Sequence, residues 1–210
     1  MKADNKVLAI SAGIAAIVLI GGGWWLTRGN AANDYAQCQR SVVAGGMDAF
    51  GGPFTLTDQR GERVTDRQVF DKPSLLYFGY TYCPDVCPLD AARNAEAVDL
   101  LEEDGIEVTP VMVSVDPARD TPEVLADFAE MFHPRMIGLT GTREEIADVA
   151  KSWRTIYRVN DQDDPDYYLV DHMTQTYLVM PGTQTVEFFS RDTEPQEMAE
   201  QVACFVNASG

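Results

Sequence analysis

The chain has 210 residues, 45% of them hydrophobic, with 33 acidic against 16 basic side chains and a formal net charge of −17. This length is typical of one globular domain plus an additional segment. The negative surface would repel phosphate backbones, which excludes nucleic-acid binding, and it suits either a well-solvated domain or docking to a basic partner.

The first segment is apolar and long enough to cross a bilayer. Residues 7–26 contain Ser11 as their only polar side chain, end at a pair of tryptophans and follow Lys2 and Lys6. About 20 apolar residues span the hydrocarbon core as a helix, and the lysines favour a cytoplasmic N-terminus. We therefore expect residues 1–28 to be a single-pass anchor in the bacterial cytoplasmic membrane, with the domain facing the periplasm.

A cleaved signal peptide is the alternative for this segment, because residues 29–31 (GNA) loosely match a small-x-small cleavage site. The apolar stretch exceeds the usual length of a signal peptide's core, which favours an uncleaved anchor. Only six residues precede the stretch, too few for an arginine-rich transit peptide, which favours a bacterial membrane over a mitochondrial one.

The positions of glycine and proline and the spacing of apolar residues then predict the helices and strands in chain order. Residues 29–52 are polar and glycine-rich, as expected of a juxtamembrane linker, and residues 53–210 follow as the folded domain. Residues 54–57 and 63–65 predict a hairpin, and the continuous apolar run 74–80 predicts a strand buried on both faces.

Helices and strands continue to the C-terminus. Pro88, Thr121-Pro122, the Thr142/Glu145 capping box and Pro195 mark four helix starts, and Gly105 marks a helix end. Strands are expected over residues 111–115, 167–170, 176–180 and 185–189. This order predicts an α/β domain with a central mixed sheet, and a Cys pair after its first core strand indicates a thioredoxin-like fold.

Cys83 and Cys87 lie in the run GYTYCPDVCP, residues 79–88, at the turn from the core strand to a helix. A thiolate there faces the positive end of the helix, which lowers its pKa and makes it a better nucleophile and metal ligand. Thiols about one turn apart lean the same way, so they allow either a disulfide or joint binding of a soft metal ion.

His172 occupies the turn before a later core strand, beside the Cys-bearing loop of such a sheet. Two thiolates and an imidazole suit copper. Zinc is the rival, and its fourth ligand would have to be Asp171 or Asp85. The other histidine, His133, and the acidic run 161–166 are expected to be structural or solvated.

Cys38 and Cys204 are the remaining cysteines, and four cysteines allow three pairings. Because domain termini often lie close together, we predict a Cys38–Cys204 disulfide that joins the two ends of the domain in an oxidising compartment.

Several motifs together resemble the SCO/SenC family. They are YFGYTYCPDVCP at 77–88, SVDPARDTP at 114–122, GLTG at 138–141 and VDH at 170–172, and the resemblance runs in order from about Gly51 to Phe189. It implies a membrane-anchored thioredoxin-like protein that binds copper and helps assemble the binuclear copper site of cytochrome c oxidase.

The resemblance places the copper ligands on Cys83, Cys87 and His172, with Asp171 beside the histidine as a second-shell residue, and makes residues 53–210 a copper-binding domain. The implied function is a metallochaperone for Cu(I) or Cu(II) that serves the copper-site subunit of the oxidase. Other copper chaperones or a thioredoxin-like reductant are further expected partners. The Asp116-Pro117 segment resembles a structural motif of the family.

Two enzymatic alternatives remain. A thiol–disulfide reductase would use Cys83 and Cys87 to keep the target's cysteines reduced, although the turn at residues 171–173 lacks the proline that such enzymes place opposite their dithiol. A thiol peroxidase or redox sensor would need a Thr and an Arg around the thiolate, and the loop has Thr81 but no Arg.

Overall fold

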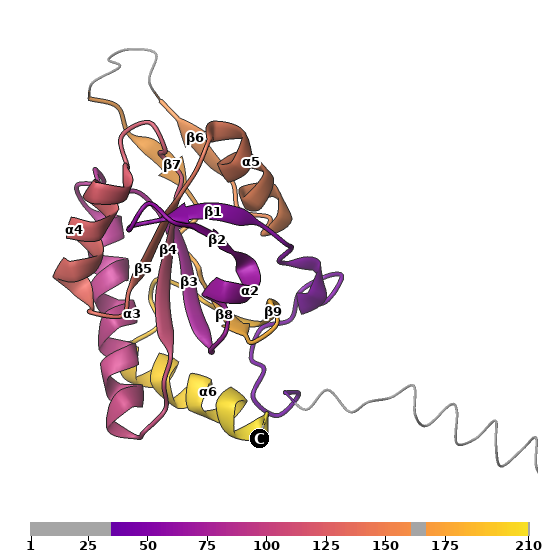
Figure 1. Ribbon diagram of the computed structural model, residues 1–210. Coiled ribbons are helices and arrows are strands. Elements are labelled where there is room, and N and C mark those ends of the chain that lie inside the picture. The colour runs from indigo at the N-terminus through magenta and orange to yellow at the C-terminus, as the bar shows by residue number, and fades with distance from the viewer. Residues whose placement is uncertain (1–34, 161–166, 210) are drawn as a thin grey trace, which may run out of the picture. The chain divides into compact units, whose positions relative to one another are not determined.

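The computed structural model describes residues 35–160 and 167–209, and residues from Cys38 onward form one compact unit (Figure 1). Its strands are β1 (Thr55–Asp58), β2 (Arg63–Thr65), β3 (Ser74–Gly79), β4 (Thr109–Ser114), β5 (Ile137–Thr140), β6 (Tyr157–Val159), β7 (Val170–His172), β8 (Thr176–Met180) and β9 (Gln184–Phe189). Its helices are α2 (Asp66–Val69), α3 (Val86–Glu103), α4 (Pro122–Phe132), α5 (Arg143–Ser152) and α6 (Pro195–Ala208), after a 3-10 turn η1 (Met47–Ala49).

Seven strands form one mixed sheet in the order β2-β1-β5-β4-β3-β8-β9, and β6 and β7 form a separate two-stranded ribbon. The three central strands β3, β4 and β5 are parallel, while the outer pairings are antiparallel. The predicted α/β fold with a central mixed sheet is therefore confirmed.

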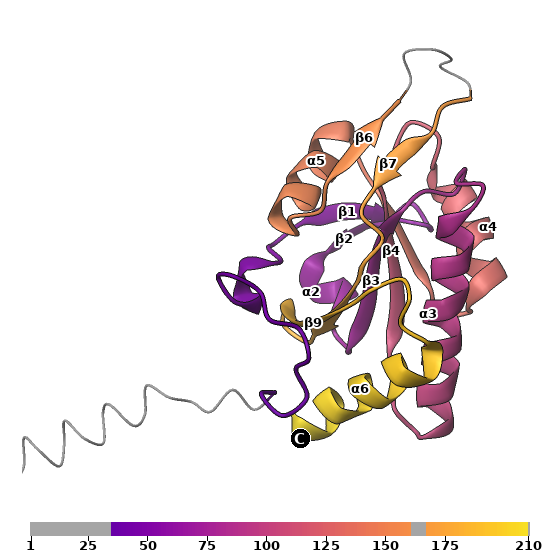
Figure 2. The same ribbon diagram turned by 180° about the vertical axis from the view of Figure 1, so that it is seen from behind.

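Helices cover both faces of the sheet (Figures 1 and 2). Helices α3, α4 and α6 lie on one side, and α2 and α5 lie on the other. Every residue of β3 and β4 is buried as a result, which accounts for their continuous apolar sequences. The side chains of β3 alternate between the two faces, so that Tyr77 faces α3 while Phe78 packs against Trp153 at the end of α5.

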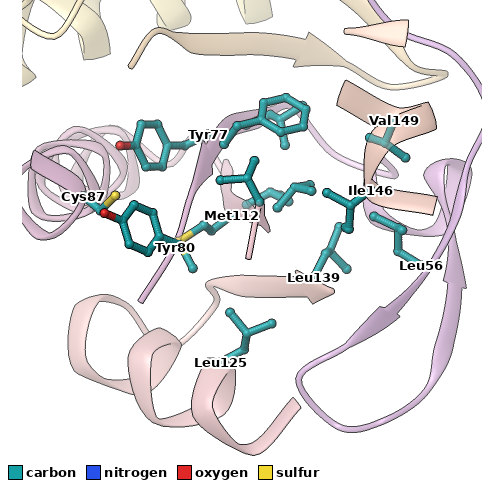
Figure 3. Packing of buried hydrophobic residues seen from close by; sticks show 14 of the residues in the cluster. Leu56, Tyr77, Tyr80, Cys87, Met112, Leu125, Leu139, Ile146 and Val149 are labelled. Carbon is teal, nitrogen blue, oxygen red and sulfur yellow. The ribbon is translucent and has the colours of Figure 1, made fainter. Parts of the chain in front are cut away.

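The hydrophobic core runs through the sheet from α3 to α5 (Figure 3). Trp153 is fully buried, and its ring contacts Phe70, Phe78 and Tyr177 with centroids 5.6–6.4 Å apart. Offset and edge-to-face aromatic contacts of this kind add to the free energy gained from burying the rings. They make β3 and β8 a rigid base for the loops that follow β3 and precede β8.

The predicted helix caps are confirmed. The Thr121 side chain accepts a hydrogen bond from the Val124 N–H, Thr142 and Glu145 form a capping box, and Gly105 ends α3 with φ +76°. A positive φ suits glycine because it has no Cβ. The caps at Thr121 and Thr142 could be predicted because a side chain near the helix start accepts a hydrogen bond from a backbone N–H group of the first turn.

Some predicted boundaries differ from the structure. Helix α3 begins at Val86, two residues before Pro88, which leaves the proline at the third helical position. The strand expected over 167–170 lies at Val170–His172 and pairs with β6 rather than with the main sheet. Strands β5 and β6 were not predicted, because four and three residues are too few to show a period.

Residues 38–52 belong to the folded unit, which corrects the linker predicted over 29–52. A disulfide joins Cys38 to Cys204 across a sequence separation of 166. The buried carboxylate of Glu187 accepts hydrogen bonds from the backbone N–H groups of Arg40 and Ser41, at 2.7 and 3.3 Å. The Phe50 ring packs on Phe188 with centroids 4.7 Å apart. Residues 38–52 have a polar, linker-like composition. Most of the groups that hold them in place belong to β9 and α6, so the composition of the segment itself does not reveal that it is part of the folded unit.

The predicted membrane anchor, residues 1–28, lies outside the described residues. Within residues 35–160 and 167–209, no helix has the length and apolar character needed to span a bilayer.

Candidate metal centre

Cys83 lies at the N-terminus of α3 and takes the place of a capping side chain. The N-cap residue Asp85 makes no side-chain cap. Instead, the Cys83 sulfur accepts a hydrogen bond from the backbone N–H of Cys87 at 3.4 Å, and the backbone N–H groups of Asp85 and Val86 also act to lower its pKa. Burial acts to raise the pKa of Cys83, but these donors outweigh it and hold the pKa below its ordinary value. Cys83 is therefore the thiol that ionises more readily.

Cys87, in the first turn of α3, is fully buried. Burial raises its pKa well above the ordinary value, a backbone N–H from Tyr80 acts against this, and the adjacent Cys83 adds to it. The rings of Tyr77 and Tyr80 extend toward its sulfur (Figure 3). An isolated Cys87 would remain a thiol at neutral pH, and a bound metal cation would displace its proton.

His172, at the end of β7, faces the sulfurs across the loop. Its Nε2 lies 3.3 Å from the Cys87 Sγ, and its Nδ1 lies 3.0 Å from the Met173 carbonyl oxygen. Because a carbonyl only accepts, Nδ1 carries the proton and Nε2 presents its lone pair toward the thiols. The imidazole packs edge-to-face on Tyr77 and Tyr80, with centroids 5.9 and 5.7 Å away. The ring is thus fixed in the tautomer and orientation of a metal ligand.

These three side chains form a donor set for a soft cation. The two sulfurs and the imidazole nitrogen all lie within 4.8 Å of one another. Within the described residues no fourth Cys, His, Asp or Glu joins this group. A structural zinc site usually has four protein ligands, whereas two thiolates and one imidazole suffice for copper, so the donors fit copper better.

The two carboxylates considered as additional ligands lie elsewhere. Asp171 is exposed and accepts a hydrogen bond from the Asn160 side chain at 3.0 Å. Successive residues of a strand point to opposite faces, so Asp171 points away from the side that His172 occupies. The role beside the histidine that the resemblance implied for Asp171 therefore stays a prediction, and the contact that the structure gives its carboxylate is the bond from Asn160. Asp85 is likewise exposed, at the N-cap of α3.

The polar neighbours of the site are Tyr77 and Asp90, which sequence reasoning missed. Asp90 is 3% exposed, one helical turn after Cys87, and burial raises its pKa while Arg93 opposes the rise. Burial raises the pKa of Tyr77, and the nearby Cys87 and Asp90 raise it further, so the Tyr77 hydroxyl lies within reach of both. The Tyr77 hydroxyl thus connects the Cys87 sulfur to a buried carboxyl one helical turn further along α3.

At Gly79 the backbone passes so close to the Tyr77 ring and the Cys87 sulfur that no side chain fits. A Cβ built there would meet the Tyr77 ring at 2.5 Å and the Cys87 sulfur at 3.3 Å. Any larger residue would therefore displace the ring that supports His172. This gives a physical reason for a glycine between the strand and the Cys loop.

A second group with metal-ligand chemistry comprises Asp99, Glu102 and His133. The His133 Nδ1 accepts a hydrogen bond from the Arg135 N–H at 3.1 Å, so in the neutral ring Nε2 carries the proton and points at both carboxylates, 3.4 Å away. Glu102 also pairs with the Arg135 guanidinium. A protonated Nε2 is not a ligand, so the geometry agrees with the structural role expected of His133.

The two thiols should differ sharply in reactivity. In the reduced, metal-free chain, we expect the alkylation of Cys83 by iodoacetamide to rise with pH at a midpoint below that of a free cysteine, because its lowered pKa keeps more thiolate at neutral pH. Cys87 should stay nearly unreactive, because its pKa is raised and its side chain is buried. Mass spectrometry of alkylated peptides across a pH series measures both. Equal rates for the two thiols would contradict this description, and Cys83→Ser isolates the Cys87 signal.

Comparison with known proteins places this site in a family context. The SCO1/SenC family model matches residues 43–207. Protein SenC of Rhodobacter capsulatus is 47% identical over 209 residues, which cover 99% of this chain and 94% of that protein. The mitochondrial SCO1 homolog 1 of Arabidopsis thaliana is 42% identical over 158 residues, 75% of this chain but only 47% of that protein.

Among solved structures, that of Arabidopsis thaliana ScoI with copper bound has a TM-score of 0.71 and 40% identity, covering 76% of this chain and 99% of that one. The likeness includes the thioredoxin-like fold, so the predicted fold of the described domain is confirmed.

Proposed function

This chain belongs to the SCO1/SenC family, and from that premise we propose that it is a copper metallochaperone. It carries copper on Cys83, Cys87 and His172 and delivers it to the binuclear copper site of cytochrome c oxidase. The observation that carries the proposal is the donor set: two sulfurs and a lone-pair-bearing Nε2 within 4.8 Å of one another. The copper-bound structure of a relative that is 40% identical supports the choice of metal.

The geometry suits a metal that is passed on rather than retained. Three ligands leave copper open to an incoming thiolate, so a target cysteine could join before a chaperone ligand leaves. Cys87 is fully buried, whereas Cys83 is 9% exposed and His172 is partly exposed, so the target would meet copper from the side of Cys83 and His172. Copper binding displaces the thiol protons, so affinity should fall as pH falls. Oxidation of the pair to a disulfide would remove both thiolate ligands.

The same proposal includes the position of the domain in the cell. The apolar stretch 7–26 with Lys2 and Lys6 before it supports a single-pass anchor in the bacterial cytoplasmic membrane, with the copper domain in the periplasm. An oxidising periplasm also suits a disulfide between Cys38 and Cys204.

A thiol–disulfide reductase is the second candidate, and the opposite pKa directions of Cys83 and Cys87 favour it. The Cys83 thiolate would attack a target disulfide and form a mixed disulfide, with the first target thiolate leaving. Cys87 would then attack Cys83 and pass its proton to the departing target sulfur, which leaves as the second target thiol. The target gains two electrons, and the pair ends as a disulfide that an external dithiol must reduce.

Metal analysis tests the proposed function. The full chain, purified reduced, is offered copper and zinc together, and bound metal is measured after gel filtration. We expect about one copper per chain, as three protein ligands suggest, and loss of that copper in Cys83→Ser, Cys87→Ser and His172→Ala. A chain that retains zinc instead, or copper that survives all three substitutions, would contradict the proposal.

A further inference from the structure

The metal ligands come from two segments that are distant in sequence, and one short segment contacts both. The Cys loop, residues 79–88, carries Cys83 and Cys87, and the His arm, residues 168–173, carries His172. Residues 114–120, which begin at the last residue of β4, lie between them and supply no ligand. We call this segment the bracket.

The bracket holds the Cys loop through Asp120. Its carboxylate is fully buried and accepts two hydrogen bonds from Thr81, from the backbone N–H at 3.1 Å and from the hydroxyl at 2.5 Å. Ser114 donates to the same carboxylate and so fixes its orientation. Thr81 is two residues before Cys83, so Asp120 sets the path of the backbone that places the first thiol.

The bracket holds the His arm through Asp116 and Arg119. The Tyr168 hydroxyl donates to the buried Asp116 carboxylate at 2.6 Å, and Arg119 donates to the other oxygen at 2.5 Å. The Arg119 guanidinium stacks on the Tyr168 ring at 3.6 Å, and the Tyr82 ring lies 4.8 Å from it. One cation therefore contacts a residue of the His arm and a residue of the Cys loop.

A direct contact completes the arrangement, because the Val170 N–H donates to the Tyr80 hydroxyl at 3.2 Å. The Arg119 Nη2 is buried without a hydrogen-bond partner among the described residues, so the guanidinium acts mainly through stacking and its bond to Asp116. Burying two carboxylates and a guanidinium costs solvation free energy that apolar packing would avoid. Thr81, Tyr82 and Tyr168, which these groups contact, each lie within four positions of a metal ligand.

We propose that Asp116, Arg119 and Asp120 are positioning residues that set the separation of the imidazole from the two thiols. Asp120 places the Cys loop, and Asp116 with Arg119 places the His arm through Tyr168. This inference rests on the proposed copper site and extends it beyond the three ligands. Groups that orient metal ligands typically contribute about 10- to 100-fold to metal affinity.

Two conservative variants of the full chain test the bracket. Asp120→Asn removes one acceptor from Thr81, and Tyr168→Phe removes the hydroxyl from Asp116 while keeping the ring under Arg119. Each should lower Cu(I) affinity, measured by competition with a chromophoric chelator, by about tenfold or more. The control is Asp127→Asn, the same charge change on the exposed side of α4, which should leave affinity unchanged. Wild-type affinity in both test variants would overturn the proposal.

Metal-free measurements separate positioning from general destabilisation. Asp120→Asn should change the Cys83 alkylation rate and leave the His172 ring resonances in place, and Tyr168→Phe should do the reverse. If both variants instead shift both signals together, the bracket is merely part of the core and the proposal fails. If the wild-type chain holds no copper on its three ligands, the proposed function fails. The positioning role is then decided by the metal-free data alone, that is, by whether Asp120→Asn affects only Cys83 alkylation and Tyr168→Phe affects only the His172 resonances.

Discussion

His172→Ala is expected to lower copper affinity by more than about 100-fold while leaving most thiol–disulfide exchange intact. Groups that only orient a ligand already contribute about 10- to 100-fold, so removing the ligand itself should cost more. The exchange chemistry needs the two sulfurs, and Cys83 draws its low pKa from backbone N–H groups of α3 rather than from the imidazole. Competition with a copper chelator measures the first quantity, and reduction of a small disulfide under single-turnover conditions measures the second.

The same pair of measurements distinguishes the two candidate functions. His133→Ala is the matched control, because His133 is the only other histidine and lies in the separate carboxylate group on α3 and α4. It should leave copper affinity unchanged. If His172→Ala binds copper as tightly as the wild type but loses disulfide reduction, the imidazole serves thiol chemistry and the chaperone assignment is wrong.

Replacing Cys38 and Cys204 together with serine is expected to lower the free energy of unfolding by up to about 5 kcal/mol. The chain-entropy relation yields that value for a loop as long as the 166-residue separation, and removal of native disulfides typically costs about 2–5 kcal/mol. Urea unfolding of wild type and variant measures the difference. The m-value should rise, because the unfolded chain without the cross-link exposes more surface.

The Cys83→Ser/Cys87→Ser variant is the control for this measurement, since those two thiols are free in the structure. Reductant should destabilise that control to about the level of the Cys38→Ser/Cys204→Ser variant. An unfolding free energy that is insensitive to both the substitution and the reductant would mean that the Glu187 hydrogen bonds alone hold residues 38–41 on β9 and α6.

Sequence patterns predicted much of this fold because the main signals are local. The helix starts at Thr121 and Thr142 depend on side chains within one turn, and the buried run of β3 depends on a central strand covered on both faces. The family resemblance is likewise confirmed by the match over residues 43–207. The spacing of Cys83 and Cys87 indicated that both thiols face one side of the helix start, as the structure shows.

Local sequence patterns did not predict which side chains surround the three ligands. In a continuous apolar strand nothing marks Tyr77 as the residue that faces Cys87 and supports His172, because both faces of β3 are buried. The resemblance pointed to Asp171, whose exposed carboxylate bonds to Asn160, whereas the buried carboxyl one helical turn after Cys87 is Asp90. The period of the α3 helix was the one signal that could have suggested Asp90.

The boundary at Cys38 was missed for a similar reason. Residues 38–52 contain few apolar side chains, and their contacts are backbone hydrogen bonds to Glu187 and a disulfide to α6. Both partners lie about 150 residues away, where no local pattern reveals them. The composition of residues 38–52 therefore predicted a linker, although the segment packs on the folded unit.

X-ray absorption spectroscopy of the Cu(I)-loaded full chain reports directly which atoms bind the metal. We expect a copper shell of two sulfurs and one imidazole nitrogen, with the nitrogen signal absent in His172→Ala and the sulfur signal halved in Cys83→Ser. A wild-type shell of sulfur alone, or one that His172→Ala leaves unchanged, would contradict the assignment of Cys83, Cys87 and His172 as the copper site.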